Sequence, residues 1–334
     1  MISLDASQMA AIQGACDSRF AMIPGGAGTG KTSIIKELST TLRRLEPKAS
    51  VALCAFAGKA AARLKEATKY NASTIHRLLG SNGTIFMAGP LTNTTVIIDE
   101  ASMVSSDLLA EIVRRSPRRL ILVGDAAQLP PVGKGQPFHD LLKLCPESTS
   151  VLSTCYRNSE AVYQAASAIR AGEIPLNTAR SPEEKWDICR TGDAANTQRV
   201  LMSHVEKGFI DFDNDIILVP RNGDNDEQAC TVKGLNRMIV DAVNPREGDE
   251  KFRVGDRVMN TKNFADADVW NGTTGSVHAI DSDGGIWITL DVPIRDMERS
   301  TPDHEAYKDT VLFDRTMARE LKLAYALTVH KAQG

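Results

Sequence analysis

The sequence lacks several features that mark other classes of protein. It has no excess of positive charge, because 39 lysines and arginines stand against 42 aspartates and glutamates, for a formal net charge of −3. This balance argues against a protein that coats nucleic acid through bulk charge, but it is compatible with a locally basic groove. No apolar run approaches the length of a membrane span, and the N-terminus lacks the charged-then-apolar pattern of a signal peptide.

The cysteines are also uninformative, since the six of them form no CxxC pair and have no histidine partner nearby. Their spacing indicates neither a zinc site nor a disulfide framework. With 42% hydrophobic and 24% charged residues, the 334-residue chain has the composition of a soluble α/β protein with two or three domains. We therefore expect a cytoplasmic protein with reduced thiols.

A glycine-rich segment carries the first chemical signal. Residues 25–32 read GGAGTGKT, a complete GxxxxGK[ST] pattern between a strand-like apolar run and an amphipathic helix. In such a turn the backbone N–H groups and the helix N-terminus point at phosphate oxygens. We expect a nucleoside triphosphate to bind here, with Lys31 at the β- and γ-phosphates and Thr32 on Mg²⁺. The binding residues expected from the pattern are Gly25, Gly26, Ala27, Gly28, Thr29, Gly30, Lys31 and Thr32.

Two acids follow a second apolar run. Residues 95–98 are apolar or β-branched and end at Asp99 and Glu100, as a central parallel strand does when it delivers acids to the carboxyl edge of a sheet. Asp99 is placed as expected for a residue that helps to bind Mg²⁺, and Glu100 is placed as expected for the general base that accepts a proton from the attacking water. A solvated acidic turn is the alternative for this pattern alone. Together with the glycine-rich segment, it favours ATP hydrolysis over storage of a nucleotide.

A third apolar run, residues 120–123, leads into a polar loop that contains two prolines. Gln128 in this loop suits a γ-phosphate sensor, because an amide can donate to a phosphate oxygen and accept from water. By itself the pattern fits a plain proline-terminated loop after a core strand better than a sensor, and only the neighbouring motifs favour the sensor.

The remaining elements continue the alternation of strands and helices. We expect a strand at residues 51–56, a helix at 59–68, a short helix capped by Ser73, and a tight hairpin at Asn82-Gly83. A second α/β unit begins near residue 148, with a helix at 161–171 and strands near 186–189 and 215–220. Between 245 and 321, short strands broken by Gly, Asn and Asp predict a small barrel.

The chain also carries the motifs STIH, DEASM, GDxxQLPPV and TVHKAQG, which are together far more specific than the glycine-rich segment alone. These elements and motifs stand in the order found in superfamily 1B DNA helicases, and the chain resembles the RecD and Dda branch of that superfamily from about Leu4 to Gly334, which implies a protein of a bacterial or phage-infected cell. The resemblance implies an α/β fold with two RecA-like doubly wound parallel-sheet domains of the P-loop NTPase type and an SH3-like β-barrel insertion. It places domain 1A at 1–147, with a pin remnant at 81–94, domain 2A at 148–244 and 321–334, and the barrel 2B at 245–320.

The resemblance also implies an activity: a 5′→3′ single-stranded DNA translocase and helicase that uses ATP and Mg²⁺. It adds Gln8 as a nucleotide contact and Arg157 as an arginine finger. Relatives often separate the DNA strands with a pin in the 81–94 region. Here the pin is short, and its bulky candidates are Ile85, Phe86 and Met87, so the resemblance supports translocation more strongly than unwinding. Since relatives continue into a further arginine-bearing motif, we expect the native chain to extend past Gly334.

The DNA groove implied by the resemblance crosses the tops of both sheets, on the face away from the nucleotide, and is read mostly through phosphates. Taken singly, the threonines can be helix caps and the histidines packed core residues. Ala57 replaces a threonine of many relatives, which removes a hydroxyl contact. The expected partners are single-stranded and forked DNA, together with single-strand-binding, replication or recombination proteins. We expect the protein to act as a monomer and not to associate with a membrane. A regulatory or loading module that binds ATP and DNA without unwinding is the other reading. The candidate DNA contacts are Lys59, Thr74, His76, Asn222, Thr328, His330 and Lys331.

Overall fold

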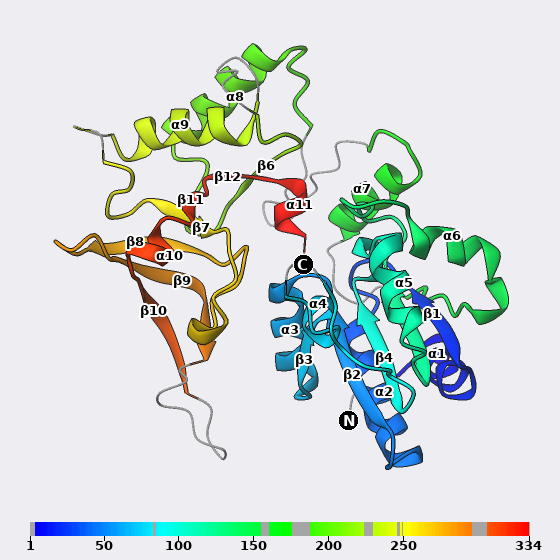
Figure 1. Cartoon of the computed structure of the whole chain (residues 1–334). Helices are drawn as coiled ribbons and strands as arrows, with labels where there is room; N and C mark the ends of the chain where they lie inside the picture. The colour runs from blue at the N-terminus through cyan, green and yellow to red at the C-terminus, as the bar shows by residue number, and fades with distance from the viewer. Residues whose placement is uncertain are drawn as a thin grey trace. The chain divides into compact units, whose positions relative to one another are not determined.

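The computed structural model describes residues 4–82, 85–154, 160–175, 188–223, 230–245, 248, 250–295 and 306–333. The chain forms two compact units, Met1–Ile188 and Cys189–Gly334 (Figure 1). Over these described ranges, no helix combines the length and the apolar character needed to cross a membrane.

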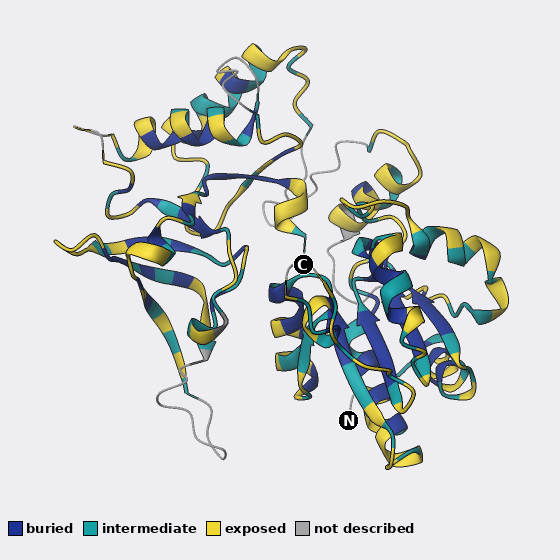
Figure 2. Cartoon of the chain, viewed as in Figure 1, coloured by how far each residue is buried: buried dark blue, intermediate teal, exposed yellow. Residues whose placement is uncertain are grey.

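The first unit is built on a five-stranded sheet with the order β1-β5-β4-β2-β3. Every neighbouring pair is parallel. Parallel strands covered on both faces need nearly continuous apolar runs, and the central strands are largely buried (Figure 2). The strands are β1 (Phe20–Pro24), β2 (Ser50–Ala55), β3 (Ala72–Thr74), β4 (Thr94–Asp99) and β5 (Arg119–Gly124).

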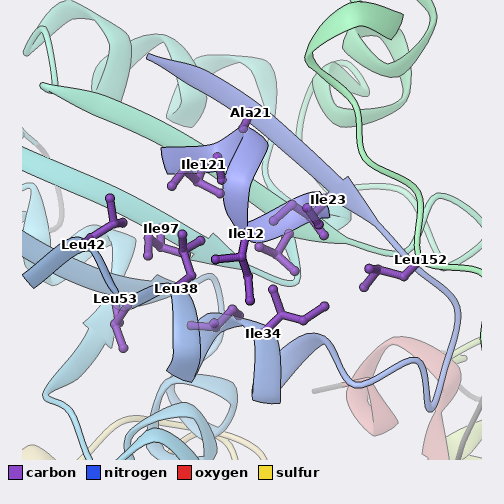
Figure 3. Packing of buried hydrophobic residues seen from close by; sticks show 14 of the residues in the cluster. Ile12, Ala21, Ile23, Ile34, Leu38, Leu42, Leu53, Ile97, Ile121 and Leu152 are labelled. Atoms are coloured by element: carbon purple, nitrogen blue, oxygen red, sulfur yellow. The ribbon is translucent and has the colours of Figure 1, made fainter. Parts of the chain in front are cut away.

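Helices cover both faces of this sheet, as expected for a doubly wound fold. One face, with Ile97 and Ile121, packs against Ile34 and Leu38 of α2 (Figure 3). Alternate strand residues such as Ile98 point to the opposite face and its own cluster. The first face carries α1 (Ala6–Asp17), α2 (Lys31–Leu45) and α3 (Gly58–Thr68), and the second carries α4 (Ile75–Leu78), η1 (Ala101–Met103), α5 (Ser106–Arg114) and α6 (Pro137–Leu144).

Polar caps fix where several of these helices begin. Asp5 and Gln8 form a capping box at the start of α1. Thr74, rather than the expected Ser73, caps α4, because its hydroxyl accepts a hydrogen bond from the N–H of Arg77 at 3.2 Å. The preceding residues, including Ser73, instead form β3 beside β2.

The residues that flank the expected Asn82-Gly83 hairpin form an antiparallel bridge, Ser81 with Phe86, and the turn itself stays a prediction. Gly83 and Thr84 lie outside the described residues. Beyond η2 (Pro146–Ser148), Leu152 forms a parallel bridge with Gly25, so this stretch adds to the β1 edge of the first sheet. The first compact unit also includes α7 (Glu160–Arg170), whose Arg170 contacts Asp125 in the loop after β5.

In the second unit, a short parallel pair of strands packs with two helices. The strands are β6 (Ile217–Val219) and β12 (Ala326–Thr328), and the helices are α8 (Ala194–Glu206) and α9 (Val232–Val243). Val219, Ile239 and Tyr325 belong to their shared core. The strand expected near 215–220 is therefore confirmed. At 188–189 the structure has no strand, and residues 186 and 187 lie outside the described part.

The unit also holds a five-stranded antiparallel sheet in the order β10-β9-β8-β7-β11. It occupies the region where a barrel was expected, and it reaches past residue 320 because β11 pairs with β7. Among the described residues its edge strands do not pair with each other, so an SH3-like barrel stays a prediction. The elements are β7 (Arg257–Asn260), η3 (Ala265–Ala267), β8 (Thr274–Ile280), β9 (Ile286–Arg295), β10 (Tyr307–Phe313), α10 (Arg315–Ala318), β11 (Leu321–Leu323) and, after β12, α11 (Val329–Ala332).

Candidate functional site

The strand order of the first sheet gathers three loops that are distant in the sequence. The glycine-rich loop follows β1, Asp125 follows β5, and Asp99 ends β4. Because these strands are neighbours and parallel, their carboxyl ends lie side by side at one edge of the sheet. Ligands of open α/β sheets bind at this edge.

The glycines of the loop are required by the space around them. Gly28 and Gly30 have φ of +78° and +81°, a region that other residues rarely adopt. A Cβ on Gly25 would lie 2.5 Å from the hydroxyl oxygen of Thr29 and 3.0 Å from the Cβ of Leu152. The loop is therefore a tight backbone turn that leads directly into α2.

Lys31 is the first residue of α2, and its ammonium lies over the loop. Nζ donates to the carbonyl oxygens of Gly25 and Gly26 at 2.9 and 3.0 Å. Thr32 follows in the first turn of the helix. A cation and the amino end of a 15-residue helix thus face the same turn, which is the arrangement that attracts a polyphosphate.

Gln8 lies below the loop rather than on an open surface. It is 4% exposed, and its Nε2 donates to the carbonyl oxygen of Thr29 at 3.2 Å. Its Oε1 accepts from the N–H of Asp5 at 3.0 Å. In this structure Gln8 therefore supports the loop backbone from α1, and its contact with a nucleotide remains a prediction.

Asp99 and Glu100 form an acidic pair beside Lys31. Burial raises the pKa of Asp99, opposed by the N–H of Glu100 and by the charge of Lys31. Burial also raises the pKa of Glu100; the charges of Asp99 and Asp125 act in the same direction, while Lys31 and a hydrogen bond from Gln128 oppose them. A carboxylate with a raised pKa is a stronger base for a proton from water.

The backbone at Glu100 is strained, since its φ is +51°. For a residue with a long side chain this conformation is unfavourable, and such residues concentrate at functional sites. It ends β4 and starts η1, so the carboxylate is placed at the edge of the sheet. Its Oε2 is buried without a hydrogen-bond partner in the described part of the chain, which suits a position for a polar ligand or water.

Gln128 joins this group through its hydrogen bond to Glu100. The turn that carries it is held by Asp125, whose carboxylate accepts from the N–H of Ala127 at 3.0 Å and whose carbonyl accepts from the N–H of Gln128 at 3.1 Å. His139 of α6 contacts the same turn at the carbonyl of Ala126, at 2.6 Å. The predicted sensor therefore lies beside the predicted base.

Sequence reasoning missed two members of this site. Asp125 directly follows the β5 apolar run, the same signal that singled out Asp99, and it could have been found that way. Arg170 ends α7 and donates from Nη1 to Asp125 Oδ2 at 3.2 Å, and no local pattern marks it. Arg157, the expected arginine finger, lies outside the described residues.

The residues present suit Mg²⁺. Its expected ligands are the hydroxyl of Thr32 in the first turn of α2 and the carboxylate of Asp99, which is held by the N–H of Glu100 at 2.9 Å. Protein sites for this ion supply one or two oxygen ligands and leave the rest to phosphates and water.

The candidate DNA contacts of the first unit lie at the same sheet edge, further along. Lys59 lies in the first turn of α3 after β2, Thr74 ends β3, and His76 follows β3. Since β2 and β3 lie beyond β4, these side chains and the phosphate loop share the carboxyl edge instead of opposite faces. Thr74 acts as a helix cap, and the exposed ring of His76 contacts Phe56 and Phe86 at centroid distances of 6.0 Å.

The candidates of the second unit gather near its parallel strands. Thr328 ends β12 and caps α11, accepting from the N–H of Lys331 at 3.3 Å, and it is 8% exposed. His330 is exposed on α11, whereas Lys331 donates to Asn271 Oδ1 at 2.7 Å. Burial and the charge of Lys322 lower the pKa of Lys331. Asn222 is exposed ahead of α9.

A parallel RecA-like sheet, a glycine-rich phosphate loop at its carboxyl edge and an adjoining acidic pair define a P-loop domain. A family model described as an AAA domain matches residues 3–186, and the chain belongs to this family.

Curated relatives confirm the resemblance to the RecD branch. The chain is 32% identical over 329 residues to the ATP-dependent RecD2 DNA helicase of Deinococcus radiodurans, which covers 95% of this chain and 42% of the relative. It is 27% identical over 377 residues to the RecD subunit of the RecBCD enzyme of Mycolicibacterium smegmatis, covering 98% of this chain and 63% of the relative. The chain therefore spans less than two thirds of the length of these relatives.

Among solved structures, the fold is similar to that of Pif1 helicases studied for DNA unwinding at forked double-stranded DNA. The TM-score is 0.54 at 20% identity, with 100% of this chain and 84% of the other covered. Together with the family match, this likeness shows the RecA-like P-loop fold expected from the sequence.

Proposed function

We propose that this chain is the motor of an ATP-dependent DNA helicase that moves 5′→3′ along single-stranded DNA. The observation that carries the proposal is the convergence of Lys31, Glu100 and Gln128 at one sheet edge, with candidate DNA contacts following the next two strands of the same edge. Nucleotide and DNA sites built on neighbouring strands of one sheet can be coupled through small movements of that sheet.

Each residue of the site has a role in this proposal. Lys31 and the loop N–H groups bind the β- and γ-phosphates, and Thr32 and Asp99 hold Mg²⁺, which would neutralise charge on the phosphates. Glu100 accepts a proton from the attacking water, and Gln128 orients that water against the γ-phosphate. Arg157 is the proposed arginine finger, and this role is taken from the resemblance alone.

The direction of movement also rests on the resemblance, because no residue type in the chain encodes it. The RecD2 relative is named as an ATP-dependent DNA helicase, and the Pif1 neighbours act at forked DNA. We extend both properties to this chain. The domain division at 147/148, 244/245 and 320/321, the SH3-like barrel 2B and the monomeric state belong to the same proposal, as do DNA-processing proteins as further partners.

The test is a pair of forked duplexes that differ only in whether the single-stranded tail is 5′ or 3′. We expect strand separation from the 5′ tail alone, and ATP turnover that rises with single-stranded DNA. Opening from the 3′ tail alone would reject the polarity. Strong stimulation of ATP turnover by DNA without strand separation would indicate a translocase whose pin is too short to unwind a duplex.

A second candidate function is a regulatory or loading module that binds ATP and DNA without unwinding, and it is favoured by the small size of the pin region, in whose described residues Ser81 and Phe86 form one isolated bridge. ATP turnover that is indifferent to single-stranded DNA would favour this second function.

A further inference from the structure

Arg170, at the end of α7, lies between the phosphate loop and the turn that carries Gln128. Its Nη1 donates to Asp125 Oδ2 at 3.2 Å, and a Cβ built on Gly26 would lie 3.0 Å from the same nitrogen. The Asp125 side chain is 5% exposed, whereas the Arg170 side chain is 45% exposed. The guanidinium is therefore anchored on a buried carboxylate and open to solvent at the loop.

Gly26 is flanked by a second cation on its other side. Its carbonyl oxygen accepts from Lys31 Nζ at 3.0 Å and from the Thr29 hydroxyl at 2.9 Å. Two cations on either side of one loop glycine match the several negative charges of a triphosphate better than one does. The planar guanidinium presents five N–H donors, which allows it to exchange one acceptor for another.

We propose that Arg170 is a triphosphate-binding residue, and that Asp125 holds it beside the loop and competes with the phosphate for it. This inference rests on the proposed ATP-binding function and adds a residue that the sequence motifs do not contain. When a triphosphate binds, Arg170 shifts from Asp125 to a phosphate oxygen. The turn from Asp125 to Gln128 then loses its ion pair with α7, so nucleotide binding changes the contacts of that helix.

Three variants of the full chain separate this role from a structural one. Arg170→Gln removes the charge, Asp125→Asn removes the competing carboxylate, and Arg118→Gln is the control. Arg118 is also 45% exposed and pairs with a carboxylate, Glu46 Oε2, at 2.8 Å, but at the opposite, amino-terminal edge of the sheet beside the start of β5. The measurement is the equilibrium affinity for a fluorescent ATP analogue, with a thermal melt of each variant.

We expect Arg170→Gln to weaken binding by about 10- to 100-fold, the loss typical of a charge-assisted hydrogen bond to an ionised group. Asp125→Asn is expected to tighten binding, because it frees the guanidinium, and Arg118→Gln should leave the affinity unchanged. If Arg170→Gln does not fold, Arg170→Lys replaces it with an expected several-fold weakening, because lysine keeps the charge without the planar fork.

Two results would overturn the inference. Unchanged affinity in a folded Arg170→Gln or Arg170→Lys variant would exclude a phosphate contact. Equal weakening in Arg170→Gln and Asp125→Asn would mean that the pair only positions the turn. Absence of ATP binding in the parent chain would instead reject the proposed function itself.

Discussion

At the level of single residues, burial of the acidic pair has opposite effects on folding stability and on catalysis. Asp99 and Glu100 are partly buried carboxylates whose pKa values are raised by burial, and the charge of Lys31 opposes that rise. Burial of charge opposes folding, while the same burial makes Glu100 a better base and strengthens each electrostatic contact with a ligand. Burial at these two positions therefore favours catalysis and lowers the stability of the fold.

Lys31→Ala is expected to lower ATP turnover by about 10²- to 10³-fold or more, since it removes a preorganised cation from the developing charge. Binding of single-stranded DNA should be largely kept. The readouts are steady-state phosphate release and DNA binding by fluorescence anisotropy. Lys36→Ala is the control, because Lys36 is an exposed lysine of the same helix α2. Parental turnover in the Lys31 variant would contradict the phosphate-loop assignment.

Glu100→Gln is expected to bind ATP normally and to hydrolyse it poorly, because an amide keeps the shape of the side chain but accepts no proton. A combined loss of binding and hydrolysis would instead assign Glu100 a structural role. Rapid-quench measurement of hydrolysis beside equilibrium ATP binding separates the two outcomes.

The same variant should be more stable than the parent at pH 7, by about 0.5–2 kcal/mol. The raised pKa of Glu100 means that the folded state holds its proton more tightly than the unfolded state does. Stability from this group is thus present at low pH and lost as the pH rises through the folded-state pKa. Urea unfolding at several pH values checks this, and the advantage of the variant should shrink toward acid pH.

At the scale of elements, the phosphate loop depends on what packs around it. α1 reaches it through Gln8, and the stretch after η2 reaches it through Leu152, which lies within the same core cluster as Ile12 and Ile34 (Figure 3). A loop held from two sides by buried residues keeps its N–H groups fixed before a ligand arrives. Such preorganisation reduces the free-energy cost of ordering the site.

Gly30→Ala tests this support, because φ at Gly30 is +81° and a Cβ there would lie 2.7 Å from Gln8 Nε2. We expect a loss of about 1–2 kcal/mol in unfolding free energy from the backbone conformation, together with weaker ATP binding. Gly192→Ala is the matched control, since φ is +82° and no atom lies within 4 Å of the added Cβ. Chemical denaturation and nucleotide titration give the comparison, and identical ATP affinities in the two variants would argue against a role for Gln8.

At the scale of the whole molecule, a net charge of −3 means that DNA must be bound by local groups rather than by a general positive field. The candidate contacts in each unit follow the carboxyl ends of parallel strands, β2 and β3 in the first unit and β12 in the second. Contacts of this kind, made mainly to phosphates, give affinity that is insensitive to base sequence and sensitive to salt.

Lys59→Ala should weaken binding to single-stranded DNA equally for different base sequences and reduce the slope of log affinity against log salt by about 0.7. Lys65→Ala is the control, because Lys65 lies in the last turn of the same helix, away from the sheet edge. Titrations at several salt concentrations measure both slopes. An unchanged slope in the Lys59 variant would remove it from the DNA contacts.

The local parts of this protein could be predicted from its amino-acid sequence. The pattern at residues 25–32 encodes a turn and a helix start, and the apolar run before Asp99 encodes a buried parallel strand, because both depend on short-range backbone preferences and on burial. The two-face alternation of the strands was predictable for the same reason. The order of the motifs then identified the family before any geometry was known.

Which of these parts lie next to one another could be seen only in the folded chain. That β5 lies between β1 and β4 is a matter of pairing between segments about a hundred residues apart, and no periodicity encodes it. This pairing brings Asp125 to the acidic pair. The packing of α7 and α1 then places Arg170 on Asp125 and Gln8 on Thr29. A side chain such as Arg170, unremarkable on its own helix, becomes part of the site because long-range packing places it there.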